Sequence, residues 1–299
     1  MHLFISQLTN GIGNGVVYAS VALALVLIYR TTGLLNFAQG EMALFATYIS
    51  WKLSHSLPVA AAIAVSMAIA FVAGAVIERV LIRPVEQGRS PLNVVIVTLG
   101  MFLAINSLAQ LVFGTNPQTM PKPWPTDSSG NDQKISIAGQ SISWAVIALA
   151  IVLVVECLLL YVLLQRSRLG LKLRAVASNP ESSRLLGINA GVMLMLGWAL
   201  ASAIGALAGS LVAARSTGFD ASLMATVLVY AFSAAALGGF DSPLGAVIAG
   251  LVVGIADALT TQYVDALNGI ELVVPLGLIV IVLLVKPTGL FGRATVERV

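Results

Sequence analysis

The sequence predicts an all-α polytopic membrane protein, a helical bundle of eight or nine transmembrane helices with its N-terminus outside and its C-terminus in the cytoplasm. Hydrophobic residues make up 58% of the 299 positions and charged residues only 10%, with a mean hydropathy of +0.96. Soluble domains carry about 25% charged residues, so this composition excludes a water-soluble enzyme or a nucleic-acid-binding protein. Long apolar runs and a one-sided distribution of basic residues complete the prediction.

Apolar runs close to the roughly 20 residues that a membrane-crossing helix needs recur along the chain. They cover residues 8–29, 34–51, 58–78, 92–113, 144–164, 191–213, 222–238, 244–262 and 270–286. Two of them are weaker predictions, because 34–51 contains several polar residues and 222–238 is short. If one of these two is re-entrant, the number of spans is eight.

The basic residues predict the orientation, because lysine and arginine accumulate on the cytoplasmic side of membrane proteins. With the N-terminus outside, the outer segments hold Lys52, Lys122, Lys134 and Arg215, and the other 12 of the 16 basic residues are inside. This bias explains the net charge of +3 without a nucleic-acid partner. Residues 1–7 contain no Lys or Arg, so we expect the first span to be retained rather than cleaved.

Two spans carry small residues at every fourth position, which places them on one helix face. Such faces let helix backbones approach closely in lipid, so both are predicted to be packing surfaces. The two stripes are Gly197, Ala201, Gly205, Gly209 and Ala213, and Ala246, Gly250, Gly254 and Ala258.

Several kinds of chemistry have no sequence support. The chain contains no G-x-x-x-x-G-K-[ST] loop for nucleotide phosphates and no G-x-S-x-G elbow. His2 and His55 are the two histidines and Cys157 is the single cysteine, too few to build a zinc site. We therefore expect no catalytic residue and no metal site, and favour transport without chemistry in this chain.

The predicted cytoplasmic loop 165–190 contains start and stop signals for a short helix over 180–186. Asn179 is a good N-cap, Pro180 suits the first helical position, and Glu181 favours the positive N-terminal end of the helix. Gly187 is the expected C-terminal stop. A helix of this length is unstable alone, so we favour a docked helix over a solvated loop with accidental caps.

This loop resembles the E-A-A-x-x-x-G segment by which permeases of ABC importers engage their ATPases, with Ser182 and Ser183 in place of the two alanines. The resemblance is to the branched-chain amino acid permeases of LivH type and extends along most of the chain. It rests on G-L-L-N-F-A-Q-G-E-M at 33–42, I-E-R-V-L-I-R-P-V at 77–85, A-A-L-G-G-F-D-S-P-L-G-A-V-I-A-G at 235–250 and K-P-T-G-L-F-G-R-A-T-V-E-R-V at 286–299.

The resemblance implies that residues 1–299 form a single permease domain of an importer in the bacterial cytoplasmic membrane. Its partners would be a second homologous permease, two ABC ATPases that bind ATP and Mg, and an extracytoplasmic solute-binding protein; this chain would hold no cofactor. The substrate would be branched-chain amino acids or a related small polar solute, and urea, amides or other amino acids stay open. The implied ATPase-coupling residues are Asn179, Glu181, Ser182, Ser183, Arg184, Leu186 and Gly187.

Polar residues near 31–42 interrupt an apolar run and predict a broken helix along the translocation pathway, because irregular backbone in a membrane lines cavities. The predicted pathway residues are Asn36, Phe37, Gln39, Gly40 and Glu41, with Thr98 and Asn106 from the fourth span. Glu41 could equally be an interfacial carboxylate. A second interruption, at 238–243, is more simply a cytoplasmic turn.

Two further expectations concern the outer loop and a rival function. The external loop 114–143 alternates Ile135, Ile137 and Ile142 with polar residues, which predicts a small hairpin. The carboxylates Glu41, Glu156 and Asp257, placed within apolar spans, motivate the rival reading of an ion-coupled secondary transporter that works alone.

Overall fold

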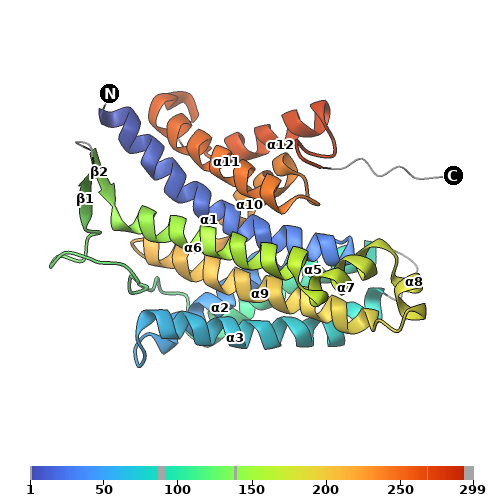
Figure 1. Cartoon of the computed structure of the whole chain (residues 1–299). Helices are drawn as coiled ribbons and strands as arrows, with labels where there is room; N and C mark the ends of the chain where they lie inside the picture. Colours follow the sequence, from blue (N-terminus) through green and yellow to red (C-terminus); the bar gives the residue numbers. More distant parts are fainter. Residues whose placement is uncertain (1, 87–91, 138–139, 268, 293–299) are drawn as a thin grey trace. The chain divides into compact units, whose positions relative to one another are not determined.

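The computed structural model describes residues 2–86, 92–137, 140–267 and 269–292, and these are mostly helical (Figure 1). Arg89, Arg293 and Arg298, which contribute to the predicted orientation, lie outside these ranges. The α-helices are α1 (His2–Thr32), α2 (Gln39–Leu53), α3 (Val59–Ile77), α4 (Arg83–Glu86), α5 (Leu92–Phe113), α6 (Trp144–Tyr161), α7 (Arg168–Ser178), α8 (Pro180–Leu185), α9 (Ala190–Arg215), α10 (Leu223–Gly238), α11 (Pro243–Tyr263) and α12 (Val273–Val285). Other elements are the π-helical turns η1 (Glu78–Ile82) and η2 (Val162–Arg166), the 3-10 turn η3 (Asp265–Leu267), and strands β1 (Lys134–Ile137) and β2 (Gln140–Ser143).

Each of the nine predicted apolar runs overlaps one of these helices. Six helices among the described residues are long and apolar enough to cross a membrane, and α10 and α12 are shorter apolar helices. The 15 residues of α2 span about 22 Å at 1.5 Å per residue, less than the hydrocarbon core of about 30 Å. The chain is thus a helical integral membrane protein, while eight or nine crossings and the sides of the termini stay predictions.

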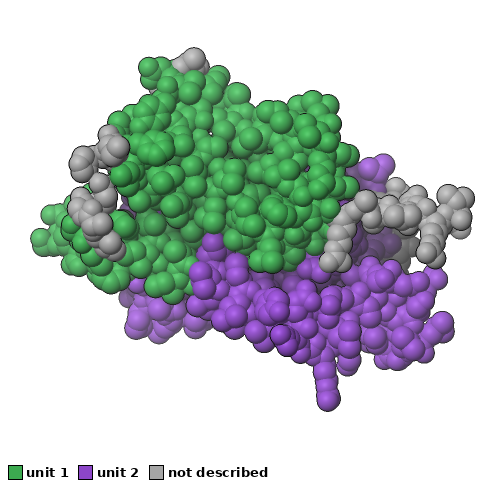
Figure 2. Space-filling view, turned by 45° about the horizontal axis from the view of Figure 1, so that its top comes forward, with its two compact units in different colours: residues 1–26, 124–151, 226–299 green, residues 27–123, 152–225 purple. Residues whose placement is uncertain are grey.

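The chain divides into two compact units (Figure 2). Unit 1 comprises residues 1–26, 124–151 and 226–299, and unit 2 comprises 27–123 and 152–225. Both units combine segments that are far apart in the sequence. Each unit is therefore held together by close contacts between helices that are distant in sequence.

In unit 1, α1 and α11 pack through glycines, as the second small-residue stripe predicts (Figure 1). A Cβ added to Gly250 would lie 2.7 Å from the backbone of Ala19, and one added to Gly254 would overlap the backbone of Gly15. A Cβ added to Gly11 of α1 would likewise lie 2.7 Å from the backbone of Ile255. Side chains larger than hydrogen at these positions would separate the two helices.

In unit 2, α9 is the central helix and packs against both α2 and α3. The first small-residue stripe is a packing surface, as predicted, and its glycines face the end of α1 and helix α2. A Cβ on Gly197 would lie 2.5 Å from the hydroxyl oxygen of Thr31, and one on Gly205 would lie 2.6 Å from Nε2 of Gln39.

The predicted break near 31–42 is a non-helical segment over residues 33–38, and α2 begins only at Gln39 instead of continuing the predicted span from residue 34. Gly33 has φ +72°, and the amide oxygen of Asn36 accepts a hydrogen bond from the backbone N–H of Ala38. Thr31 lies against Gly197 of α9, and Gln39 lies against Gly205. These two glycines are eight residues apart, which is about 12 Å along the helix axis. The first turn of α2 therefore lies along the middle of α9.

The second interruption is a tight turn, and its place on the cytoplasmic side stays a prediction. Gly239 has φ +98°, and the Ser242 hydroxyl caps α11 by accepting from the N–H of Gly245, with Pro243 at the first turn.

The outer-loop hairpin is present as predicted. Strands β1 and β2 pair in antiparallel register, with Ile135 opposite Ile142. The Asp132 carboxylate accepts from Trp124 Nε1 at 2.7 Å and from the Ser143 hydroxyl at 3.2 Å, which ties the hairpin to the loop before it.

Candidate functional site

Helix α8 is fixed at both ends by the residues that the sequence singles out. The side-chain oxygen of Asn179 accepts from the N–H of Ser182 at 2.9 Å, and Pro180 occupies the first turn. At the other end Gly187 has φ +77°, its N–H donates to the Arg184 carbonyl, and the Ile188 N–H donates to the Ser183 carbonyl. This pair of bonds is a Schellman C-cap, whose left-handed residue favours glycine.

The two faces of α8 differ. On one face Ser183 is only 3% exposed, and α8 packs against the neighbouring helices α7 and α9. Leu185 and Leu186 are 90% and 79% exposed, and Glu181 and Ser182 are exposed with them. Two adjacent exposed leucines on a capped segment with polar neighbours form a small apolar tip suited to another protein's surface.

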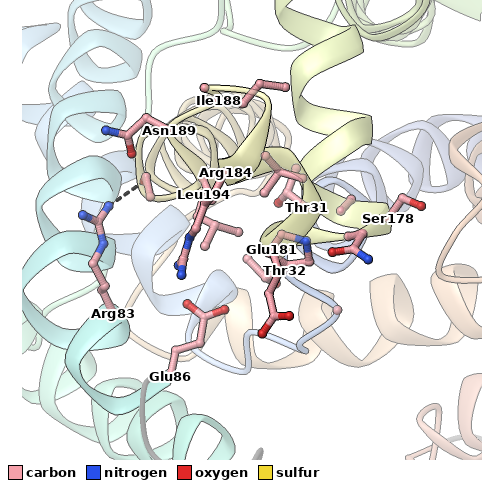
Figure 3. Close-up of a pocket in the computed structure, with 18 residues that line it drawn as sticks. Thr31, Thr32, Arg83, Glu86, Ser178, Glu181, Arg184, Ile188, Asn189 and Leu194 are labelled. Carbon is pink, nitrogen blue, oxygen red and sulfur yellow. Dashed lines mark hydrogen bonds between the residues drawn. The ribbon is translucent and has the colours of Figure 1, made fainter.

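A hollow of about 1130 Å³ lies between the 176–191 segment, the end of α1 and the 83–86 turn, all within unit 2 (Figure 3). Glu86 and Arg184 attract each other electrostatically across it, and Figure 3 shows their side chains directed toward one another. Asn179, Glu181 and Gly187 also line it.

Arg83 joins two elements at the wall of this hollow. Its guanidinium binds the carboxylate of the fully buried Glu78 through two hydrogen bonds, of 3.1 and 2.9 Å. It also donates to the Gly191 carbonyl at 2.5 Å, the bond drawn as a dashed line from Arg83 in Figure 3. Gly191 is the second residue of α9, and a Cβ there would lie 2.8 Å from the guanidinium carbon. The link therefore connects η1 to the start of α9, directly after α8.

The predicted pathway residues fall into two hydrogen-bonded groups. In the first, Nδ2 of buried Asn36 donates to Oε1 of Gln39 at 3.3 Å, and Nε2 of Gln39 donates to the Ala201 carbonyl of α9 at 3.0 Å. Phe37 is half-buried beside them, and Gly40 is buried in the first turn of α2.

The second group is centred on Asn106 of α5. Its Nδ2 donates to Glu41 Oε2 at 2.9 Å and to the Ala221 carbonyl at 2.8 Å, and its Oδ1 accepts from Gln110 Nε2 at 2.7 Å. The i,i+4 pairing of Asn106 and Gln110 agrees with the sequence. Thr98 is buried two turns earlier and bonds its own helix at the Val95 carbonyl, apart from this group.

A second cavity of about 450 Å³ lies beside Asn106, which is its only predicted pathway residue. Asp220 also lines it, and the sequence analysis missed this residue because it lies in the short connection between two spans and belongs to no motif. Hydrogen bonds from the Ser222 hydroxyl and N–H hold the pKa of Asp220 below its usual value.

Asp257 is one of the carboxylates that motivate the alternative of an ion-coupled secondary transporter. It accepts hydrogen bonds from two tyrosines of unit 1. Its oxygens accept from the Tyr230 hydroxyl at 2.8 Å and the Tyr18 hydroxyl at 3.4 Å, and the two rings stack with centroids 4.5 Å apart. Glu156 is likewise buried, at 6% exposure.

Among solved structures, PsaBC from Streptococcus pneumoniae, in complex with Fab, is similar with a TM-score of 0.50 at 12% identity, over 95% of this chain and 96% of that chain. This likeness supports the helical fold alone.

Curated sequences give the family. LivH of Salmonella typhimurium and LivH of Escherichia coli K12, both named high-affinity branched-chain amino acid transport system permease proteins, are each 32% identical to this chain over 99% of it and 98% of their own length. BraD of Pseudomonas aeruginosa, with the same description, is 31% identical over the same shares. The relatives are permease proteins and not enzymes. The family described as branched-chain amino acid transport system / permease component matches residues 7–283, and this chain belongs to it.

Proposed function

We propose that this chain is the membrane-spanning subunit of an ATP-driven ABC importer in the bacterial cytoplasmic membrane. It translocates branched-chain amino acids, or a related small polar solute, by alternating access. The observation that carries the proposal is α8, a helix capped at both ends whose exposed tip at Leu185 and Leu186 has the character of a docking surface. Membership of the permease family supports the substrate class.

The proposed assembly contains a second homologous permease, two ABC ATPases that bind ATP and Mg, and an extracytoplasmic solute-binding protein. Closure of the ATPases displaces α8, and the hollow behind it leaves room for this movement. The displacement reaches η1 through the bond from Arg83 to Gly191. In this way a short peripheral helix acts on the membrane-spanning helices.

The broken segment and the Asn106 group belong to the proposed pathway. Irregular backbone at membrane depth is stable where protein or a cavity surrounds it, and within this segment Asn36 and Ala38 are buried. The bond between Glu41 and Asn106 joins α2 to α5, so a shift of α2 moves the wall of the neighbouring cavity.

Replacing the docking tip tests the proposal. We expect Leu185→Glu with Leu186→Glu to lower co-purification of the ATPases at least tenfold, because each leucine buried at an interface stabilises it by about 1.5–3 kcal/mol. ATP-driven uptake in proteoliposomes falls in parallel, while the amount of permease in the membrane is unchanged. Leu57→Glu, at another exposed leucine between α2 and α3, is the matched control.

Two results would contradict the importer. One is wild-type ATPase binding and uptake in the double variant. The other is gradient-driven uptake by this chain alone in ATP-free vesicles, which is what the ion-coupled secondary transporter predicts.

A further inference from the structure

The cavity of about 450 Å³ in unit 2 lies where the second half of α5 meets the start of α10. Phe102, Asn106 and Gln110 come from one face of α5, and Asp220, Ala221 and Ser222 come from the connection before α10. Its volume is within the usual range for small-molecule sites, about 300–1,000 Å³.

The lining is divided by polarity in a way that suits an amphipathic zwitterion. Phe102 and Leu103 supply apolar surface, whereas Asp220 supplies an anion and Gln110 an amide. Nε2 of Gln110 uses one N–H on Asn106 and has a second to donate.

Asp220 is held so that half of its carboxylate stays available. The N–H and hydroxyl of Ser222 both bond Oδ1, at 2.8 and 2.6 Å, and Oδ2 has no hydrogen-bond partner within the described part of the chain. Asn106 anchors the adjacent Ala221 carbonyl to α5, which fixes the carboxylate at the cavity wall. The same Ser222 bonds lower the pKa of Asp220, so it is charged at neutral pH.

We infer that this cavity is a solute subsite in which the Asp220 carboxylate binds the ammonium group of an amino acid, with the solute's apolar side chain against Phe102 and Leu103. The inference rests on the proposed function and deepens it. Urea and amides carry no cation for Asp220, so the subsite selects an amino acid among the substrates that the family resemblance leaves open.

Protection from a thiol reagent tests this subsite directly. Ser107 lines the cavity, and replacing the single Cys157 by Ser makes Ser107→Cys the only reactive position. We expect millimolar leucine to slow its reaction with a water-soluble maleimide at least threefold. Urea, acetamide and 4-methylpentanoate, which lacks the ammonium group, should leave the rate unchanged.

Adding Asp220→Asn should abolish protection by leucine, and Asp220→Glu should restore part of it. Asp127 is the matched control, because its Oδ1 likewise accepts two bonds within a turn, from the N–H groups of Ser129 and Asn131. Asp127→Asn should leave protection intact.

Three outcomes would overturn the subsite: no protection by leucine, equal protection by urea or acetamide, or protection that survives Asp220→Asn. The assay uses no ATP. Protection by leucine without ATP-driven uptake in the assembled importer would therefore refute the importer and leave the subsite standing.

Discussion

Arg83 shows how one residue can connect the π-helical turn η1 to the start of α9. Arg83 directly follows the π-helical turn η1, from Glu78 to Ile82, and its guanidinium reaches both the buried Glu78 carboxylate and Gly191. Glycine at 191 leaves the space that the guanidinium occupies. A buried carboxylate of this kind is stable only while its partner is present.

Removing that partner should be costly. We expect Arg83→Gln to destabilise the purified protein by roughly 3 kcal/mol, because losing one member of a buried ion pair leaves an uncompensated charge. Thermal unfolding in detergent measures the loss. The double variant Glu78→Gln, Arg83→Gln should be more stable than Arg83→Gln alone, and equal stability of the two would show that Glu78 carries no charge that needs Arg83.

At the scale of elements, small residues decide which helices meet. Both stripes predicted from four-residue spacing are contact surfaces, one between α1 and α11 and one between α9 and α2. Helix pairs in lipid have no hydrophobic drive to associate, so close backbone contact and dispersion stabilise them.

A single methyl group should therefore separate α1 from α11. We expect Gly254→Ala to lower the unfolding temperature, because its Cβ would overlap the backbone of Gly15, which cannot move without the whole helix. Gly277→Ala on α12 is the control, since a Cβ there meets nothing within 4 Å. It should be neutral or stabilising by up to about 1 kcal/mol, as alanine favours helix. Equal effects of both changes would refute the packing argument.

The sequence was informative about elements and less so about contacts between them. Hydropathy located the nine apolar helices, and the residues around Asn179 and Gly187 located α8, because both signals are local. Helix α7 was missed since its mixture of basic and apolar residues has little hydropathy; Ser167 as N-cap and the inward-facing Leu173 and Val176 were the available signals. The Glu41–Asn106 bond and the Asp220 cavity depend on tertiary packing, which no spacing encodes.

At the scale of the whole molecule, several helices expose large apolar side chains. Ile96 and Leu111 of α5, Leu159 of α6 and Leu284 of α12 are each more than half exposed. Such surface is stable against lipid or a second permease and not against water. The lysines and arginines lie at the ends of the predicted spans or in the connections between them, whereas Glu41, Glu156 and Asp257 lie within spans. The orientation of the chain is therefore a property of the molecule as a whole.

That orientation can be tested because the chain has one cysteine, Cys157. In a Cys157→Ser background, Ser129→Cys lies in the predicted external loop and Ser178→Cys in the predicted coupling loop, and both positions are exposed. The 12-to-4 bias of basic residues predicts that a membrane-impermeant maleimide labels the Ser129→Cys variant in intact cells. The Ser178→Cys variant should react only after the membrane is permeabilised. The reverse pattern would invert the topology and place α8 on the side away from ATP, and so would contradict the importer as well.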